Sequence, residues 1–87
     1  MKVIKKFKLA IEPSQKISMP FNSEILAITS SDGNAEICVL ADGSYSDIER
    51  SFIISAMDKE IPQRLNVTHF VGTFSHEGHA LFVFEER

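Results

Sequence analysis

The chain has 87 residues, enough for one domain with a hydrophobic core but too few for a second core. Its hydrophobic content of 44% excludes a disordered chain, and no apolar run approaches the ~20 residues that a membrane-spanning helix needs. The net charge of −3 is unevenly distributed, because residues 1–16 hold five Lys and one Glu, a net of +4, and the remainder carries −7. A nucleic-acid-binding domain is usually basic overall, so the net charge argues against that class of protein.

Residues 2–11 alternate between apolar and charged side chains, a period-2 pattern that predicts a strand with one buried and one wet face. The apolar parity holds Val3, Phe7, Leu9 and Ile11. The other parity holds Lys2, Lys6 and Lys8. Lys5 falls on the apolar parity, which suggests a sheet edge. We expect this basic strand to lie beside an acidic one, such as the end of the chain with Glu85 and Glu86.

Residues 15–19 predict a short second strand with Ile17 and Met19 inward, and Pro20 places it at an edge or ends it, because proline cannot donate to a ladder. Two β-rich runs, residues 24–30 and 35–41, flank an Asp-Gly turn at residues 32–33, which predicts a hairpin. A two-residue loop pairs Ile28 with Ile37 and Leu26 with Val39. The opposite face then carries Ile25, Ala27, Cys38 and Leu40. Because both faces are mostly apolar, we expect this hairpin to be central or to meet a partner.

Residues 42–47 form a predicted loop, and residues 50–55 a strand with Phe52 and Ile54 on one parity. Residues 57–66 are the least regular stretch, in which Pro62 is well placed to start a single helical turn through Leu65. About seven strands with short connections result. They predict an all-β fold, a single small antiparallel β-sandwich or barrel that takes in residues 1–87.

The last hairpin, residues 70–84, contains four of the seven Phe residues. A three-residue loop, His76-Glu77-Gly78, gathers them on one face, with Phe82 over the bare backbone of Gly72 and Phe70 opposite Phe84. A two-residue Glu77-Gly78 loop sets Phe70 opposite Glu85 and splits the Phe residues between faces, so side-chain segregation favours the longer loop. That register also sets His69 opposite Glu85.

No motif in the chain predicts catalysis, so we expect no enzyme and no cofactor. Cys38 is expected to be a buried, inert thiol, and a single Cys excludes an internal disulfide, which fits a reducing compartment. His69 and His79 lie roughly 20 Å apart in the favoured register, too far for one metal ion. His76 is expected to be an exposed turn residue. We therefore predict no metal site.

Four segments carry a family resemblance. They are Ile17-Ser-Met-Pro20, Ser23-Glu-Ile-Leu-Ala-Ile28, Phe70-Val-Gly-Thr-Phe74 and Gly78-His-Ala-Leu-Phe-Val-Phe-Glu85. In this order the chain resembles a family of small proteins of unknown function found in tailed bacteriophages and prophages. Residues 42–47 and 57–66 depart from that pattern. The resemblance implies expression in the cytoplasm of a host bacterium and an accessory role, with no catalytic residues to carry over.

Three hypotheses for function follow. The first is a non-enzymatic module that binds a host or phage protein, for example an inhibitor of a host defence system of the anti-CRISPR or anti-restriction type. Its candidate surface consists of acidic residues and one tyrosine around the strand at 50–55, namely Asp42, Tyr45, Asp47, Glu49, Asp58 and Glu60. The second is a self-associating structural module, such as a homodimer, built on the doubly apolar hairpin of residues 25–40. The third is weak nucleic-acid binding through Lys2, Lys5, Lys6 and Lys8.

Overall fold

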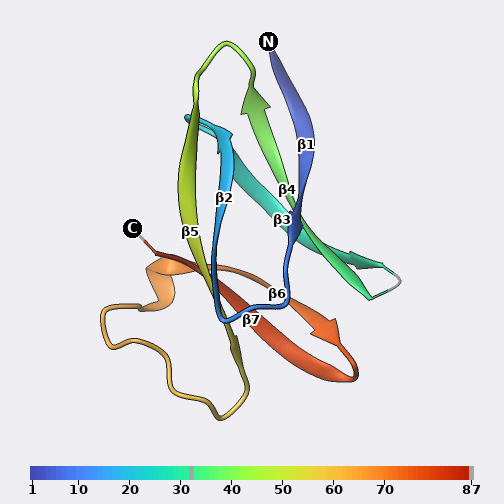
Figure 1. The fold of residues 1–87 in the computed structure, drawn as a ribbon, viewed down its shortest axis with the longest axis vertical. Helices are drawn as coiled ribbons and strands as arrows, with labels where there is room; N and C mark the ends of the chain where they lie inside the picture. Colours follow the sequence, from blue (N-terminus) through green and yellow to red (C-terminus); the bar gives the residue numbers. More distant parts are fainter. Residues whose placement is uncertain (32, 87) are drawn as a thin grey trace.

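Two antiparallel sheets pack face to face in the computed structural model, which describes residues 1–31 and 33–86 (Figure 1). The three-stranded sheet contains, in order, β1 (Lys2–Leu9), β4 (Asn34–Asp42) and β3 (Glu24–Ser31). The four-stranded sheet contains β2 (Ser14–Pro20), β5 (Asp47–Ala56), β7 (His79–Glu86) and β6 (Phe70–His76). One short 3₁₀ turn, η1 (Val67–His69), precedes β6. The predicted all-β class is confirmed, and the fold is a small β-sandwich.

Alternating residues of the strands point between the sheets and form the core, as the period-2 pattern predicts. On β4, the four apolar residues from Ala35 to Ala41 at odd positions are at most 2% exposed. The inward residues of the other strands include Leu9, Ile17, Met19, Phe52, Ile54, Phe74 and Val83. No helix among the described residues is long and apolar enough to cross a membrane.

The partner of β1 differs from the expected one. β1 pairs with β4, so that Lys2 stands opposite Asp42 and Lys8 opposite Glu36. The expected pairing with Glu85 and Glu86 is wrong, because those residues belong to β7 in the other sheet. The alternation within a strand shows which face is buried, but it does not identify the neighbouring strand.

The β3–β4 hairpin contains a β-bulge that reverses part of the predicted pattern. Ile28 pairs with Ile37 as expected, but Ile25 rather than Leu26 pairs with Val39 because the register shifts between Ile25 and Ala27. Ile25 therefore packs against the core, and Leu26 is 51% exposed. The predicted Asp-Gly turn includes residue 32, which lies outside the described residues.

The β6–β7 hairpin has a two-residue loop, so the expected three-residue loop is wrong. His76 pairs with His79, and the loop residues Glu77 and Gly78 both have positive φ, 50° and 79°. A register shift between Phe70 and Gly72 then restores the predicted Phe70–Phe84 pair. Without this bulge, a two-residue loop would set Phe70 opposite Glu85, which is why the sequence pattern favoured the longer loop.

This register turns three of the four aromatic residues of the hairpin outward, Phe70, Phe82 and Phe84, while Phe74 stays in the core. Phe82 stands opposite Thr73 rather than over Gly72, and the ring centroid of Phe70 lies 6.4 Å from that of Phe82 and 5.7 Å from that of Phe84. Gly72 instead faces the other sheet, where a Cβ atom on it would lie 2.8 Å from Ile28 Cγ1. β3 and β6 therefore meet closely at one side of the sandwich.

The segment between β5 and β6 returns to the four-stranded sheet, where Ile61, Pro62 and Arg64 lie beside Ile53 of β5 and Glu86 of β7, and η1 contacts β7. The predicted turn at Pro62 is present, since the Leu65 amide donates to the Pro62 carbonyl oxygen at 3.0 Å. Leu65 is only 6% exposed, although it is not part of the core between the sheets. An ion pair between Arg64 and Glu86 ties this segment to β7.

Candidate interaction surface

The acidic residues expected to form one surface lie at opposite ends of the molecule. Figure 1 shows the β4–β5 connection at one end of the molecule and the segment after β5 at the other. Asp42 ends β4, Tyr45 lies in the connection and Asp47 begins β5, whereas Asp58 and Glu60 follow β5. β5 separates the two groups by ten residues, roughly 33 Å at 3.3 Å each. Glu49 faces outward from β5 opposite Ser18. A single partner site made of all six residues would have to extend over the full length of this strand.

Asp42 is engaged within its own loop. Its Oδ1 accepts the Ser44 backbone N–H at 3.0 Å and the Ser44 hydroxyl at 2.7 Å, and it lies 3.4 Å from the amino group of Met1. The Ser44 bonds, the backbone one first, lower the pKa of Asp42 from 3.8 to about 2. The carboxylate thus shapes the turn from β4 into β5.

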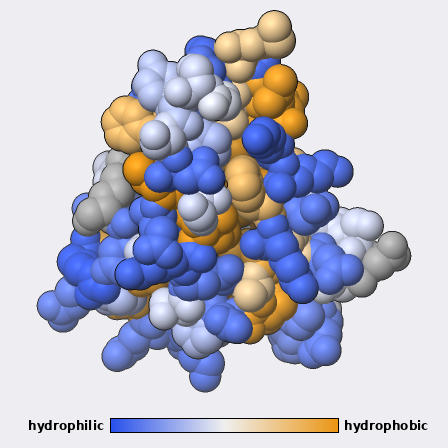
Figure 2. All heavy atoms as spheres, turned by 45° about the horizontal axis from the view of Figure 1, so that its top comes forward, coloured by the Kyte–Doolittle hydropathy of each residue, from blue (hydrophilic) through white to orange (hydrophobic). Residues whose placement is uncertain are grey.

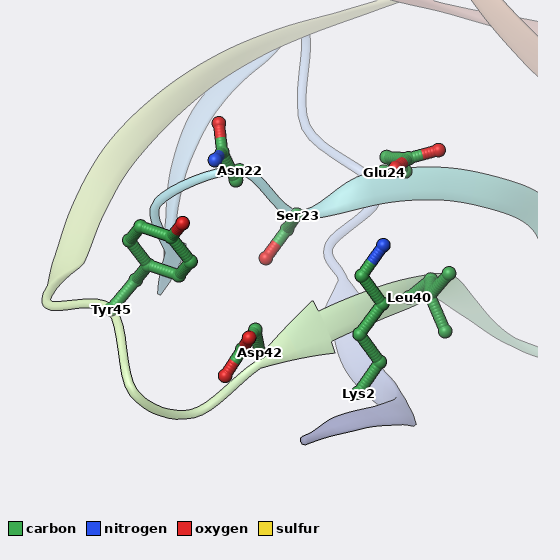
Figure 3. A pocket seen from close by; sticks show the side chains of 7 residues that line it. All are labelled: Lys2, Asn22, Ser23, Glu24, Leu40, Asp42 and Tyr45. Carbon is green, nitrogen blue, oxygen red and sulfur yellow. The ribbon is translucent and has the colours of Figure 1, made fainter.

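A hollow of about 470 Å³ lies beside this turn, and Figure 3 shows the seven side chains around it. It brings together Lys2, a candidate for nucleic-acid binding, with Asp42 and Tyr45, two candidates for protein binding. Lys2 points from β1 toward β3, where Glu24 lies (Figure 3). Tyr45 also contacts Phe21, with ring centroids 6.0 Å apart. Because both charge signs line the hollow, it does not select an anion or a cation.

β1 is the most regular of the four edge strands. β2 follows Pro13 and ends at Pro20, and β3 and β6 each contain a bulge. The eight residues of β1 contain no proline and no bulge, the two features that commonly disfavour pairing at a sheet edge. On its other side, no strand among residues 1–31 and 33–86 pairs with it.

The four lysines of β1 do not share one face. Lys2, Lys6 and Lys8 point to the outer side, while Lys5 stands opposite the fully buried Val39 on the inner side. Lys5 is nevertheless exposed, and Val3 on the same side is 44% exposed, so the four-stranded sheet does not cover this half of β1. Phe7, the aromatic residue of β1, packs against the core, and Tyr45, which lines a hollow with Lys2, packs on Phe21 instead. These lysines thus lack the stacking surface of an oligonucleotide site.

The outer face of the three-stranded sheet mixes apolar and charged side chains. Ile4, directly opposite Leu40, is 66% exposed, and Cys38 stands opposite Ala27. Cys38 is half-buried there, which corrects the expectation of a buried thiol. In Figure 2, hydrophobic side chains reach the surface in several places between hydrophilic ones.

Arg50 and Glu85 form an ion pair in the sandwich interior that the sequence did not predict. Arg50 Nε lies 2.6 Å from Glu85 Oε2, and Arg50 Nη2 lies 2.7 Å from Glu85 Oε1. The expected pair of Glu85 with His69 is wrong, because His69 caps η1 through its contact with the Asn66 amide. The available signal was parity: Arg50 shares the inward parity of Phe52 and Ile54.

The whole chain, residues 1–87, matches the model of a domain of unknown function, DUF7352. The chain belongs to this family. No curated protein and no solved structure matches it.

In the described residues of this DUF7352 domain, one edge of the three-stranded sheet is unpaired and its outer face carries exposed apolar side chains. In the described part of the chain, no group of three or more His, Cys, Asp and Glu residues could hold a metal ion. The features that stand out are the free β1 edge and the uncovered outer face of the same three-stranded sheet. We therefore take this sheet as the candidate interaction surface.

Proposed function

We propose that the protein is a non-enzymatic protein-binding module in which the free edge of β1 pairs with an extended, acidic segment of a partner. The observation that carries this proposal is an unbroken eight-residue edge strand with four lysines. An edge strand presents unpaired backbone N–H and C=O groups, and an extended peptide that pairs with them adds a strand to the sheet.

The lysines of β1 determine which charge the partner segment should carry. Like charges directly opposite each other on neighbouring strands are destabilising, so a second copy of β1 is a poor partner for this edge. Lys5 adds to the selection, because it points to the inner side of the sheet and is exposed there, beside the side chain that an added strand would place on the same face. An acidic segment would supply carboxylates to lysines on both faces.

The resemblance to small proteins of tailed bacteriophages and prophages favours a host protein as the partner in the bacterial cytoplasm. A small module that adds to a partner segment can block that segment from other contacts. An inhibitor of a host defence system, of the anti-CRISPR or anti-restriction type, is the specific role that we propose.

The test titrates the protein with an eight-residue peptide, Glu-Glu-Thr-Thr repeated twice, whose carboxylates lie on both faces of an extended strand, and follows binding by NMR. We expect shift changes and amide-exchange protection concentrated on β1. Lys5→Glu should weaken binding several-fold, and Lys16→Glu, on the exposed outer side of β2, serves as the matched control. A second peptide of equal charge, with Pro in place of each Thr, cannot complete the ladder and should bind far less.

Two results would overturn the proposal. Equal binding of the two peptides would show charge attraction without strand addition. Tighter, strongly salt-dependent binding of single-stranded DNA than of the Glu-Thr peptide would favour the nucleic-acid alternative.

A further inference from the structure

The four lysines of β1 differ in what stands opposite them on β4, the strand that already pairs with β1. The two lysines near the ends of β1 each stand opposite a carboxylate. In the middle, Lys5 stands opposite Val39 and Lys6 opposite Cys38, which carry no charge to match. Within residues 1–31 and 33–86, the ion pairs include no lysine of β1. The two middle lysines, which point to opposite faces, are therefore the ones most open to a carboxylate from another molecule.

Next to these lysines, the same edge exposes apolar side chains on both faces. Ile4 on the outer side is 66% exposed, and Val3 on the inner side is 44% exposed. In Figure 1 the N-terminal end of β1 extends past the end of β2, so β2 does not cover it there. Consecutive residues of a strand point to opposite faces. Each face of the free edge thus presents one exposed apolar residue followed by one lysine.

This order gives the edge a direction that an added strand can match. Such a strand places one side chain beside each side chain of β1, on the same face. Apolar residues suit the positions beside Val3 and Ile4, and acidic residues suit those beside Lys5 and Lys6. Every strand pair among the described residues is antiparallel, and antiparallel ladders are slightly more stable than parallel ones. Read from its own N-terminus, the matching segment is acidic, acidic, apolar, apolar.

We propose that the β1 edge selects partner segments in which two consecutive acidic residues precede two apolar residues, and that it binds them antiparallel. This inference rests on the proposed function and names the sequence class of the partner. The chain itself contains no such block, because its one pair of consecutive acidic residues, Glu85 and Glu86, precedes Arg87. The partner segment therefore belongs to a different protein.

The test compares three peptides of eight residues and four Glu each by NMR titration. The matched peptide, Glu-Thr-Glu-Glu-Ile-Val-Glu-Thr, sets its Glu-Glu pair beside Lys6 and Lys5 and its Ile-Val pair beside Ile4 and Val3. The second has the same residues in reverse order, and the third is Glu-Glu-Thr-Thr repeated twice. We expect the matched peptide to bind about fivefold more tightly than either, because two apolar cross-strand pairs form only in its register and direction.

A charge exchange tests the register directly. Lys5→Glu should weaken binding of the matched peptide, and a peptide with Lys in place of its fourth residue, Glu-Thr-Glu-Lys-Ile-Val-Glu-Thr, should restore binding to this variant. Lys16→Glu on β2 is the control and should give no such rescue.

An apolar exchange tests the other half of the block. Ile4→Thr should reduce the preference for the matched peptide over the Glu-Glu-Thr-Thr peptide at least twofold. Val67→Thr, on η1 at an 83% exposed residue, should leave the preference unchanged. Both side chains are exposed, so the fold should tolerate these changes, and urea unfolding verifies it.

The outcomes separate this inference from the proposed function. If the reverse peptide or the Glu-Glu-Thr-Thr peptide binds as tightly as the matched one, with amide protection on β1, the selection is overturned and strand addition by acidic segments stands. If none of the three peptides protects the amides of β1, both proposals are overturned.

Discussion

Arg50 and Glu85 form a two-pronged ion pair in the sandwich interior, with Nε–Oε2 and Nη2–Oε1 distances of 2.6 and 2.7 Å. The remaining Arg50 nitrogen, Nη1, donates to the Ser23 carbonyl oxygen at 2.6 Å. The side chains are only 17% and 9% exposed. One guanidinium thus joins β5, β7 and the turn that enters β3.

Removal of one partner of this pair should be strongly destabilising. We expect Arg50→Met to lower the free energy of unfolding by about 3–5 kcal/mol, because it leaves the Glu85 carboxylate buried without its cation. Replacement of both residues, Arg50→Met with Glu85→Leu, should recover most of that loss. Urea unfolding measures both variants.

The exposed Arg64–Glu86 pair provides the control for this prediction. Its arginine side chain is 63% exposed, so Arg64→Met should cost less than about 1 kcal/mol. Equal losses for Arg50→Met and Arg64→Met would contradict the role given to the interior pair.

Gly72 should tolerate no side chain. In Gly72→Ala the new Cβ would lie 2.8 Å from Ile28 Cγ1, and the overpacking should cost about 1–3 kcal/mol in chemical denaturation. The cost should fall in an Ile28→Ala background, which removes the clashing atom. Gly43→Ala is the control, since nothing lies within 4 Å of its Cβ position. Similar losses at both glycines would rule out a close contact between β3 and β6.

Glu77 should be replaceable with a gain in stability. It occupies the first position of a two-residue turn with a φ of 50°, a conformation that Asn adopts more readily than Glu. We expect Glu77→Asn to raise the melting temperature by a few degrees, with Glu49→Asn on a strand as the control. A loss of stability at position 77 would instead support the three-residue loop.

Asp42 should make stability depend on pH in the acid range. Its pKa is about 2 in the folded protein against 3.8 ordinarily, so the unfolded chain binds a proton first as the pH falls. The stabilisation by the ionised carboxylate is therefore complete above about pH 4 and disappears as the pH falls through about 2. Asp42→Asn, which keeps the acceptor oxygen for Ser44, should be less stable than the wild type at neutral pH. The difference between their unfolding midpoints should vanish near pH 2, and a gap that stays constant would contradict this.

Local pattern predicted much of the fold because it reflects local physics. The alternation in β1, β2 and β5 identified the inward residues, such as Ile17 and Phe52, since side chains of a strand alternate between its two faces. Pro20 correctly placed β2 at an edge, because proline lacks the N–H that a central ladder requires. Pro62 likewise began a single turn that ends at Leu65.

The candidate surface was harder to predict, because it depends on neighbours that lie far away in sequence. The lysines of β1 were visible, but their position on a free edge, with Lys5 on the inner side, followed only from the pairing of β1 with β4. The candidate acidic residues flank the predicted strand at residues 50–55 in the sequence, but in the structure the length of β5 holds the two groups apart.

The sequence by itself determined the strand count, the inward parity of β1, β2 and β5, and the turn that Pro62 begins. Only the tertiary structure decided the two bulges, the sheet to which β1 belongs and the Arg50–Glu85 pair. The reason is physical: alternation and turn preference depend on a residue and its immediate neighbours. Register shifts, sheet membership and buried ion pairs depend on how two surfaces fit, and each depends on residues that only the complete sandwich brings together.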